Sequence, residues 1–350
     1  MRTALVLLAI VLAGCMQTAA TTEESLVSFP AAPLDVDAAT VVDELRVFSA
    51  AHPLRVGNSA DHEAARVDLL ARFADLGLTT WRHDFTPDGD GQLPQANIVG
   101  LQWGTTHPDE WVVVGGHYDV VPTPSCPAAL PVCPEQVNTQ GTYDDGSGTM
   151  LTVGLAAAYS KVETPFTIAY VAFDGEERGL QGSRAFAEML VSGTPYGNVT
   201  VRAMLDLDMF GLNWPGVDSP IYFDDNSPEL KAYVKDVAAA IGIPDGLILY
   251  QGISLGRSDY DSFFQIGAPT GFFISDFERF QAPADVPVQA PQESGQAYPF
   301  WHRYDTYDSM VLMAGSEADV VAGFQTAADL ASAVLWRMAV SEEPLSSIDV

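Results

Sequence analysis

The stretch F-T-I-A-Y-V-A-F-D-G-E-E, Phe166 to Glu177, joins an apolar run to a pair of acidic residues. Its first eight residues, Phe166–Phe173, are mostly β-branched or aromatic, which is typical of a buried strand. Glu176 and Glu177 therefore follow the carboxyl end of a predicted strand. This combination indicates an α/β protein with acidic side chains at one edge of its sheet.

Two other apolar runs end in the same way. Trp111–Gly116 is followed at once by His117, and Val201–Leu207 is followed by Asp208. Functional groups of open α/β sheets gather outside the carboxyl ends of the strands. Three separate segments thus deliver imidazole and carboxylate groups to the same kind of position, which is typical of a functional site.

Helical and strand patterns alternate along most of the chain. Besides the strands above, the patterns predict helices at Ala38–Ala51, Asp61–Leu76, Ser147–Tyr159, Gln181–Leu190, Pro228–Ile241 and Glu317–Met338, and strands at Ile98–Trp103, Leu247–Tyr250 and Thr270–Ile274. Such alternation predicts an α/β layered fold with a largely buried sheet. No linker divides residues 30–345, so we expect one domain there.

The 350-residue chain carries 46 acidic against 16 basic side chains, a formal net charge of −30. Phosphate binding needs clustered lysine and arginine, so this balance argues against nucleic acid as a partner. We interpret the surplus as a solubilising surface on an exported protein. A salt-adapted surface and calcium sites are alternatives that the sequence leaves open.

The first residues form a predicted targeting segment. Arg2 precedes an apolar run, Ala4–Ala13, that is too short for a permanent membrane span. The run ends in L-A-G-C, which resembles the cleavage box of bacterial lipoproteins, so Cys15 would become a lipidated first residue. We expect a signal peptide over 1–14, a polar tether over 15–29 and attachment to a membrane surface. An ordinary signal peptide with an incidental cysteine is the alternative.

The other cysteines, Cys126 and Cys133, lie seven residues apart in a proline-rich segment. An oxidising compartment favours a local disulfide between them. A pair of thiolate metal ligands is the weaker alternative, because the spacing does not fit a zinc knuckle.

Five short motifs contain the residue types that bind divalent ions. In chain order they are G-G-H-Y-D (Gly115–Asp119), Y-D-D-G-S-G (Tyr143–Gly148), F-D-G-E-E (Phe173–Glu177), L-D-L-D-M (Leu205–Met209) and W-H (Trp301–His302). Imidazole and carboxylate groups suit zinc-like ions. A spare glutamate beside a ligand glutamate supplies the base that a metal-activated water needs. Each motif alone would more often be a turn, a helix cap or a solvated face. Their order and position indicate a two-metal hydrolase.

This succession resembles the exported double-zinc aminopeptidases of the aminopeptidase Y type, over most of residues 95–310. The resemblance extends to G-R-S-D-Y-D-S-F-F-Q-I-G-A-P (Gly256–Pro269) and to S-G-Q-A-Y-P-F-W-H (Ser294–His302). It implies a three-layer α/β fold with a central mixed, mostly parallel β-sheet flanked by helices. Residues 30–345 would then be a single zinc peptidase catalytic domain.

The resemblance also implies two bound divalent ions, with zinc as the expected metal, and it assigns their ligands. The implied set is His117 and Asp208 for one ion, Glu177 and His302 for the other, and Asp144 as the bridge between them. Glu176 would be the general base that takes the proton of the attacking water. An exchange of roles between Glu176 and Glu177 is the alternative.

Further residues around this set have expected supporting roles. Asp119 and Asp206 are predicted to accept hydrogen bonds from ligand imidazoles, although Asp206 could equally be a structural acid. Asp145 is expected to cap the helix that follows it. Arg257 matches a family position near the substrate's amino end. Trp301 departs from the family, which has a tyrosine there, and an indole N–H can donate a hydrogen bond but cannot titrate.

The sequence therefore predicts a metal-dependent exopeptidase that hydrolyses the amino-terminal bond of a peptide substrate. A carboxypeptidase or dipeptidase of the same family, a glutaminyl cyclase and a non-catalytic binding domain are the alternatives. The complete D-D-G-S-G motif and His117 argue against the cyclase, which usually binds one zinc. We expect a monomer at a periplasmic face or cell surface, with no nucleic-acid partner.

Overall fold

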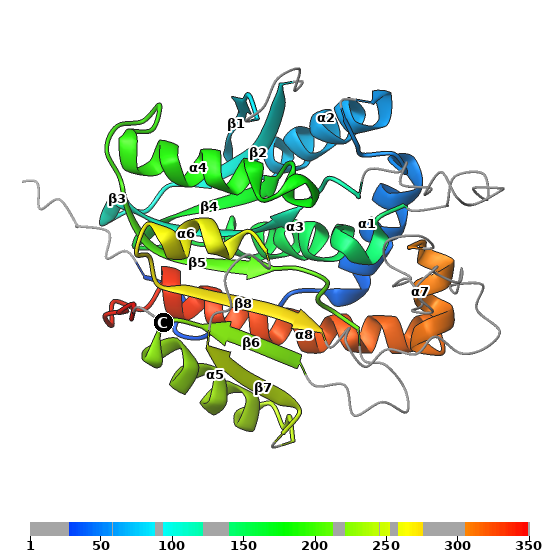
Figure 1. The fold of residues 1–350 in the computed structure, drawn as a ribbon. Coiled ribbons are helices and arrows are strands. Elements are labelled where there is room, and N and C mark those ends of the chain that lie inside the picture. The colour runs from blue at the N-terminus through cyan, green and yellow to red at the C-terminus, as the bar shows by residue number, and fades with distance from the viewer. Residues whose placement is uncertain are drawn as a thin grey trace, which may run out of the picture.

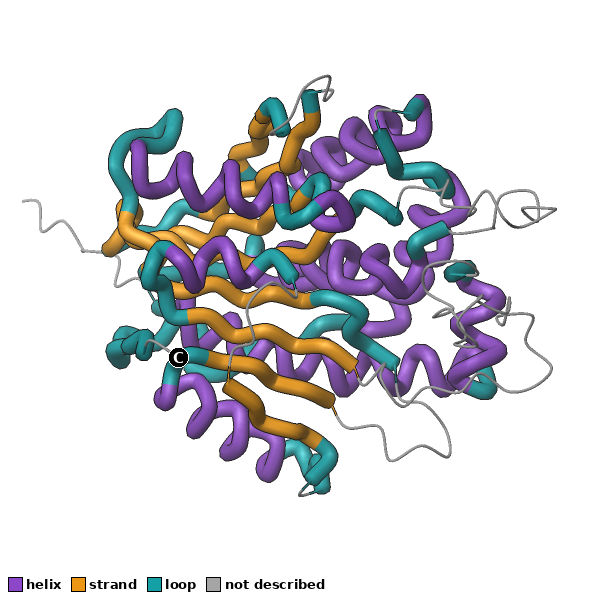
Figure 2. The backbone as a smooth tube through the Cα atoms, in the orientation of Figure 1, coloured by secondary structure: helices purple, strands orange, loops and turns teal. Residues whose placement is uncertain are grey.

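The computed structural model describes residues 28–57, 59–87, 94–121, 140–212, 221–244, 246–252, 258–275 and 305–348. Within these residues, eight strands form one sheet in the order β1-β2-β4-β3-β5-β8-β6-β7. Helices lie on both sides of the sheet, which gives three layers (Figures 1 and 2). The expected mixed, mostly parallel α/β fold is confirmed.

The strands are β1 (Thr79–Phe85), β2 (Gln95–Gln102), β3 (His107–His117), β4 (Phe166–Phe173), β5 (Thr200–Leu207), β6 (Ile221–Asp225), β7 (Ile248–Gly252) and β8 (Thr270–Ser275). The helices are α1 (Ala38–Ala51), α2 (Ala60–Asp75), α3 (Ser147–Tyr159), α4 (Gln181–Ser192), α5 (Pro228–Ala240), α6 (Tyr260–Gln265), α7 (Tyr307–Ala314) and α8 (Glu317–Ala339). There are also two short turns of helix: η1 (Thr142–Gly146) lies directly before α3, and η2 (Glu176–Arg178) follows β4.

The centre of the sheet is parallel. Strands β4, β3, β5 and β8 run in one direction, whereas β2 and β6 pair antiparallel at either side of this group. The carboxyl ends of β3, β4 and β5 therefore meet at one edge of the sheet. This edge is where His117, Asp208 and the turn η2 lie.

Alternating side chains of the central strands build two apolar cores. Val112 and Val114 of β3 face the side covered by α1, α2, α3, α5 and α8, while Trp111 and Val113 face the side covered by α4 and α6. Because both faces are covered, β4 is buried along its whole length and β3 is buried from Trp111 to His117. This explains why β3 and β4 read as continuous apolar runs in the sequence.

The predicted elements agree with the observed ones to within a few residues, and α1, α3 and β4 have the predicted bounds. Ser227 caps α5 as expected, since its side chain accepts the N–H of Leu230. Four elements were missed: β1, β6, α6 and α7. Strand β1 is a half-exposed edge strand with polar residues, and α6 has six residues, so neither has a strong apolar pattern.

Within the described ranges, no helix combines the length and apolarity required to cross a bilayer. The predicted signal peptide (1–14), Cys15, most of the tether (15–29), Cys126 and Cys133 lie outside the described residues. Those expectations stay predictions.

Candidate metal centre

His117 is the last residue of β3, and its side chain is buried at the carboxyl edge of the sheet. Its Nδ1 lies 3.0 Å from the backbone carbonyl oxygen of Asp119, to which an Nδ1–H would donate. The Asp119 carboxylate lies 3.6 Å from the same nitrogen. With Nδ1 oriented in this way, Nε2 points toward the acids of neighbouring segments.

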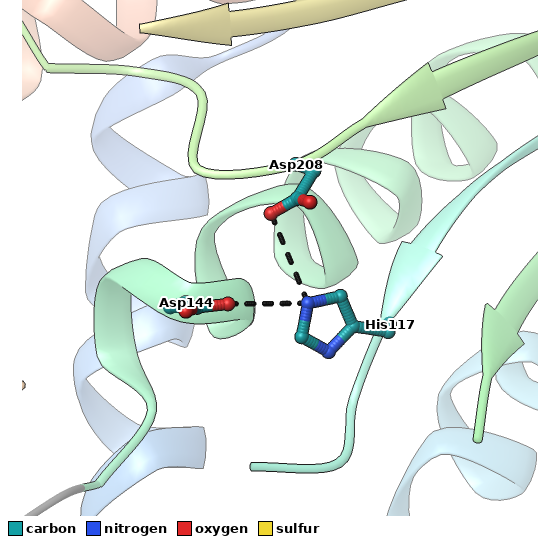
Figure 3. A group of neighbouring side chains, drawn as sticks. All are labelled: His117, Asp144 and Asp208. Atoms are coloured by element: carbon teal, nitrogen blue, oxygen red, sulfur yellow. Dashed lines mark ion pairs between the residues drawn. The ribbon is translucent and has the colours of Figure 1, made fainter. Parts of the chain in front are cut away.

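Three of these acids surround Nε2 of His117. Its distance is 3.1 Å to Oδ1 of Asp144, 3.8 Å to Oδ1 of Asp208 and 3.9 Å to Oε2 of Glu176. Figure 3 shows Asp144 and Asp208 pointing toward the imidazole from two different segments. One ligand atom each from His117, Asp144 and Asp208 lie within 4.8 Å of one another. The structure thus brings together three of the five predicted ligands.

The other two predicted ligands differ in status. Glu177 lies beside Glu176 in η2, at the same edge of the sheet, but outside this three-residue group. His302 lies outside the described residues, as do Arg257 and Trp301. Their roles stay predictions.

Hydrogen bonds from the neighbouring segments fix the turn η2, which carries Glu176. The backbone N–H of Glu176 donates to Oδ1 of Asp119 at 3.1 Å. Asp174, just before this turn, is buried and accepts hydrogen bonds from Arg66 at 2.7 Å and from the hydroxyl of Tyr118 at 2.8 Å. Since Tyr118 follows His117, these contacts fix the end of β3 and the end of β4 relative to each other.

The carboxylate of Asp145 connects three of the motifs by hydrogen bonds. This connection was not predicted from the sequence. Its Oδ2 accepts the N–H of His117 at 3.1 Å, and its Oδ1 accepts the N–H groups of Gly148 at 2.8 Å and Met209 at 3.1 Å. The contact with Gly148 lies in the first turn of α3, although Gly146, and not Asp145, is the residue directly before this helix. The other two contacts tie β3 and the end of β5 to the same carboxylate.

Asp305 supports the bridging candidate Asp144. Its two oxygens accept the N–H groups of Tyr143 at 2.7 Å and Asp144 at 2.8 Å. Burial raises the pKa of Asp305 to about 7, although these N–H groups favour its charged form. The peptide bond between Asp144 and Asp145 is cis.

Asp206 and Asp259 are a second pair of buried acids near the centre. Asp206, one strand position before Leu207, accepts the N–H of Tyr260 at 2.8 Å, so it holds the start of α6. Burial raises the pKa of Asp206 well above its usual value, and the charges of Asp259 and Asp208 raise it further. Its predicted contact with a ligand imidazole is not among the described contacts.

Several carboxylates crowd around the imidazole of His117. Burial alone would lower the pKa of His117, but the carboxylates of Glu176, Asp119, Asp144 and Asp208 outweigh burial and raise it well above its usual value. For Glu176, burial raises the pKa, and the charges of Asp208, Asp259 and Glu177 raise it further. Without another cation, protons must therefore balance the crowded carboxylates.

A divalent metal ion fits this arrangement. The Nε2 atom of His117 is buried and makes no hydrogen bond of normal geometry to the described residues, although carboxylate oxygens surround it. Imidazole nitrogen and carboxylate oxygen are a donor set that zinc accepts. The residues present therefore fit the ligands of at least one such ion.

Comparison with known proteins identifies the family. The sequence profile of peptidase family M28 matches residues 97–320, a range that includes β3, α3, β4 and β5. The chain belongs to peptidase family M28. Membership of this family agrees with the aminopeptidase-like resemblance of the motifs.

Similar M28-like proteins carry metallopeptidase names. The chain is 35% identical over 121 residues to a probable zinc metalloprotease of Phaeosphaeria nodorum, covering 33% of this chain and 23% of that protein. It is 31% identical over 183 residues to aminopeptidase YwaD of Bacillus subtilis, covering 51% and 35%. The alignments thus span only about a quarter to a third of the lengths of these relatives.

The fold has a close counterpart among solved structures. A zinc aminopeptidase from Bacillus subtilis superposes with a TM-score of 0.66, at 15% identity, over 88% of this chain and 96% of that one. At this identity the likeness concerns the fold alone. This M28 member therefore shares the overall fold of that protein.

Proposed function

We propose that this M28 protein is a metal-dependent aminopeptidase that hydrolyses the amino-terminal bond of peptides. The observation that carries the proposal is the convergence of His117, Asp144 and Asp208 beside Glu176 at the carboxyl edge of the sheet. The aminopeptidase names of relatives that share this region support the choice of substrate end.

The proposed centre holds two zinc ions. His117 and Asp208 would hold one, Glu177 and His302 the other, and Asp144 would bridge them. When bound, such ions polarise the scissile carbonyl and lower the pKa of a water molecule, which is the chemistry that peptide hydrolysis requires.

Glu176 is the proposed general base. Its side chain is 13% exposed, and its Oε2 lies 3.9 Å from Nε2 of His117, so it faces the ligand group while it keeps access to solvent. The Asp119 carboxylate holds its backbone N–H. A glutamate in this position can take a proton from the attacking water and deliver it to the leaving amine. Arg257 and Trp301 are proposed to line the substrate end of the site.

We also propose that the protein is exported and tethered to a membrane surface through lipid on Cys15. A disulfide between Cys126 and Cys133 would suit the oxidising compartment that such export implies. Mass spectrometry of the protein from its native membrane fraction tests both modifications.

A panel of amino-acid anilides, free and N-acetylated, tests the proposed substrate class. We expect cleavage of the free anilides, no cleavage of the acetylated ones, and loss of activity with a chelator that zinc restores. Metal analysis should find close to two ions per chain. Cleavage only at a free carboxyl end would favour a carboxypeptidase, and cyclisation of amino-terminal glutamine would favour a glutaminyl cyclase.

Glu176→Gln tests the proposed base. The variant keeps the size of the side chain but cannot take a proton, so we expect kcat to fall by about 10²–10⁴-fold with metal content unchanged. Glu188→Gln, on the exposed face of α4, is the matched control and should match the unmodified protein. A near-normal kcat for Glu176→Gln would remove Glu176 from this role.

A further inference from the structure

Arg55 is a fully buried arginine in the connection between α1 and α2. Its guanidinium donates only to backbone carbonyls among the described residues. It contacts the oxygens of Tyr118 at 2.5 Å, His52 at 2.9 Å, Gln140 at 2.6 Å and Gly141 at 2.7 Å. It also lies over the ring of Phe48, 5.0 Å from the ring centroid. One side chain therefore joins three distant segments.

Two of these segments carry metal-ligand candidates. Tyr118 directly follows His117, and Gly141 directly precedes the turn η1 that contains Asp144. The N–H of Val120 returns a hydrogen bond to the carbonyl of Arg55 at 3.0 Å. Arg55 therefore fixes, through their backbones, the two segments whose side chains lie 3.1 Å apart at the centre.

Gly141 shows how tightly this contact is built. Its φ is +52°, and a Cβ atom there would lie 2.7 Å from Nη2 of Arg55 and would also collide with the side chain of Val120. Any other residue at this position would have to displace the side chain of Val120, the guanidinium of Arg55 or the backbone of η1. The close packing of the Arg55 guanidinium against the backbone at position 141 thus requires glycine there.

The charge of Arg55 suits the same location. Burial lowers its pKa to about 10, while the charges of Asp305, Asp119, Asp145 and Asp144 act in the opposite direction. The guanidinium therefore stays charged at neutral pH among acids that would otherwise repel one another. Asp305, the acid with the largest effect on the pKa of Arg55, accepts the N–H groups of Tyr143 and Asp144 in η1.

We propose that Arg55 is a positioning residue that holds His117 and Asp144 in their metal-binding arrangement before any metal is bound. The inference rests on the metal site of the proposed function, but it concerns metal binding and not the choice of substrate. The planar fork of five N–H donors makes all four of these backbone contacts, whereas an ammonium group has only three N–H donors and lacks the fork geometry.

Titration of the metal-free protein with Co²⁺, followed by its visible absorption, tests this role. For Arg55→Lys we expect the dissociation constant to rise by about 10–100-fold, as for other residues that orient ligands, with an altered absorption spectrum. Unchanged affinity and spectrum would overturn the proposal.

Arg202→Lys is the matched control. Arg202 also lies over a ring, that of Phe166, and donates to three backbone carbonyls, those of Met338, Ser341 and Glu343, but at the start of β5. We expect this variant to lose thermal stability while Co²⁺ affinity is kept. Equal weakening of Co²⁺ binding in both variants would reduce the role of Arg55 to general stability and overturn the proposal.

Hydrogen exchange of the unmodified protein decides the matter if Arg55→Lys does not fold. If the site is preformed, amides in residues 140–148 exchange as slowly without metal as with it. Fast exchange that slows only after metal is added would overturn the proposal. Neither measurement uses a substrate, so both remain informative if the protein proves not to be an aminopeptidase.

Discussion

At the scale of the residue, the acidic side chains around His117 have two distinct structural roles. Asp144 and Asp208 present oxygens to its Nε2, whereas Asp145 and Asp305 accept backbone N–H groups and hold the segments in place. A carboxylate that accepts several N–H groups is oriented by them and cannot turn toward an ion. The two neighbouring residues of the D-D pair therefore differ in role: Asp144 is a ligand candidate, and Asp145 holds the backbone.

This division marks the limit of what the sequence could predict at the site. His117 and Asp208 were predictable from their places after parallel strands, whose carboxyl ends meet at one edge, whereas Asp144 was implied by the family resemblance. The supporting residues were not. Arg55 reaches Gly141 across 86 positions and Asp305 reaches Asp144 across 161, and no local pattern encodes such contacts. Their importance comes from burial, which a single sequence does not display.

Asp225 lies at the end of β6, which is separated from β5 by strand β8. Burial raises its pKa to about 6, and Lys231, whose Nζ lies 4.0 Å away, only partly offsets this. An unfolded chain releases this proton near pH 4, whereas the folded protein keeps it until about pH 6. The folded state thus binds more protons in this interval, so its stability falls as pH rises through it.

Asp225→Asn should remove this pH dependence and raise the free energy of unfolding at pH 7 by about 1–2 kcal/mol, a figure reduced for partial solvent screening. At pH 4 the variant and the unmodified protein should be alike. Urea unfolding at both pH values measures the difference. Asp236→Asn, at an exposed position of α5, is the control. An Asp225→Asn protein that is less stable than the unmodified protein at pH 7 would contradict the assignment.

At the scale of the element, the site depends on how closely α3 approaches two strands. Gly148, in the first turn of α3, leaves no room for a Cβ, which would collide with the carbonyl oxygen of Leu207 at the end of β5. A Cβ atom added to Gly116 of β3 would collide with the same carbonyl oxygen. The elements were predictable from apolar periodicity, but this approach is a tertiary contact and was not.

Gly148→Ala should therefore displace the end of β5, which is followed by Asp208. We expect a loss of about 1–3 kcal/mol in the free energy of unfolding, together with weaker metal binding. Gly154→Ala in the same helix is the control, because its Cβ would meet the side chain of Val41 in α1 and not the site. Calorimetry with and without Zn²⁺ measures both quantities. Normal metal affinity in Gly148→Ala would show that the strand end adapts.

At the scale of the whole molecule, the net charge of −30 acts against compactness. Raising NaCl from about 0.01 M to about 1 M shortens the Debye length from about 30 Å to about 3 Å, so repulsion between surface acids is screened. We expect the thermal midpoint of the metal-free protein to rise over this range. Sucrose at equal osmolality controls for solvent exclusion. A midpoint that falls with salt would show that attractive ion pairs dominate.

Helix α8 joins parts of the molecule that are far apart in the sheet. It packs against α1, α3, α5 and α7 and against the central strands β3, β4 and β5 (Figure 1). Unfolding of the elements packed on one end of α8 would expose the helix face that the elements on its other end also cover. The two groups of elements are therefore expected to lose their structure together. An ion bound only to the native state stabilises whatever unfolds with its site. Through α8 and α5, which packs on β6, metal binding at one edge would thus protect the remote strands β6 and β7 from local opening and proteolysis.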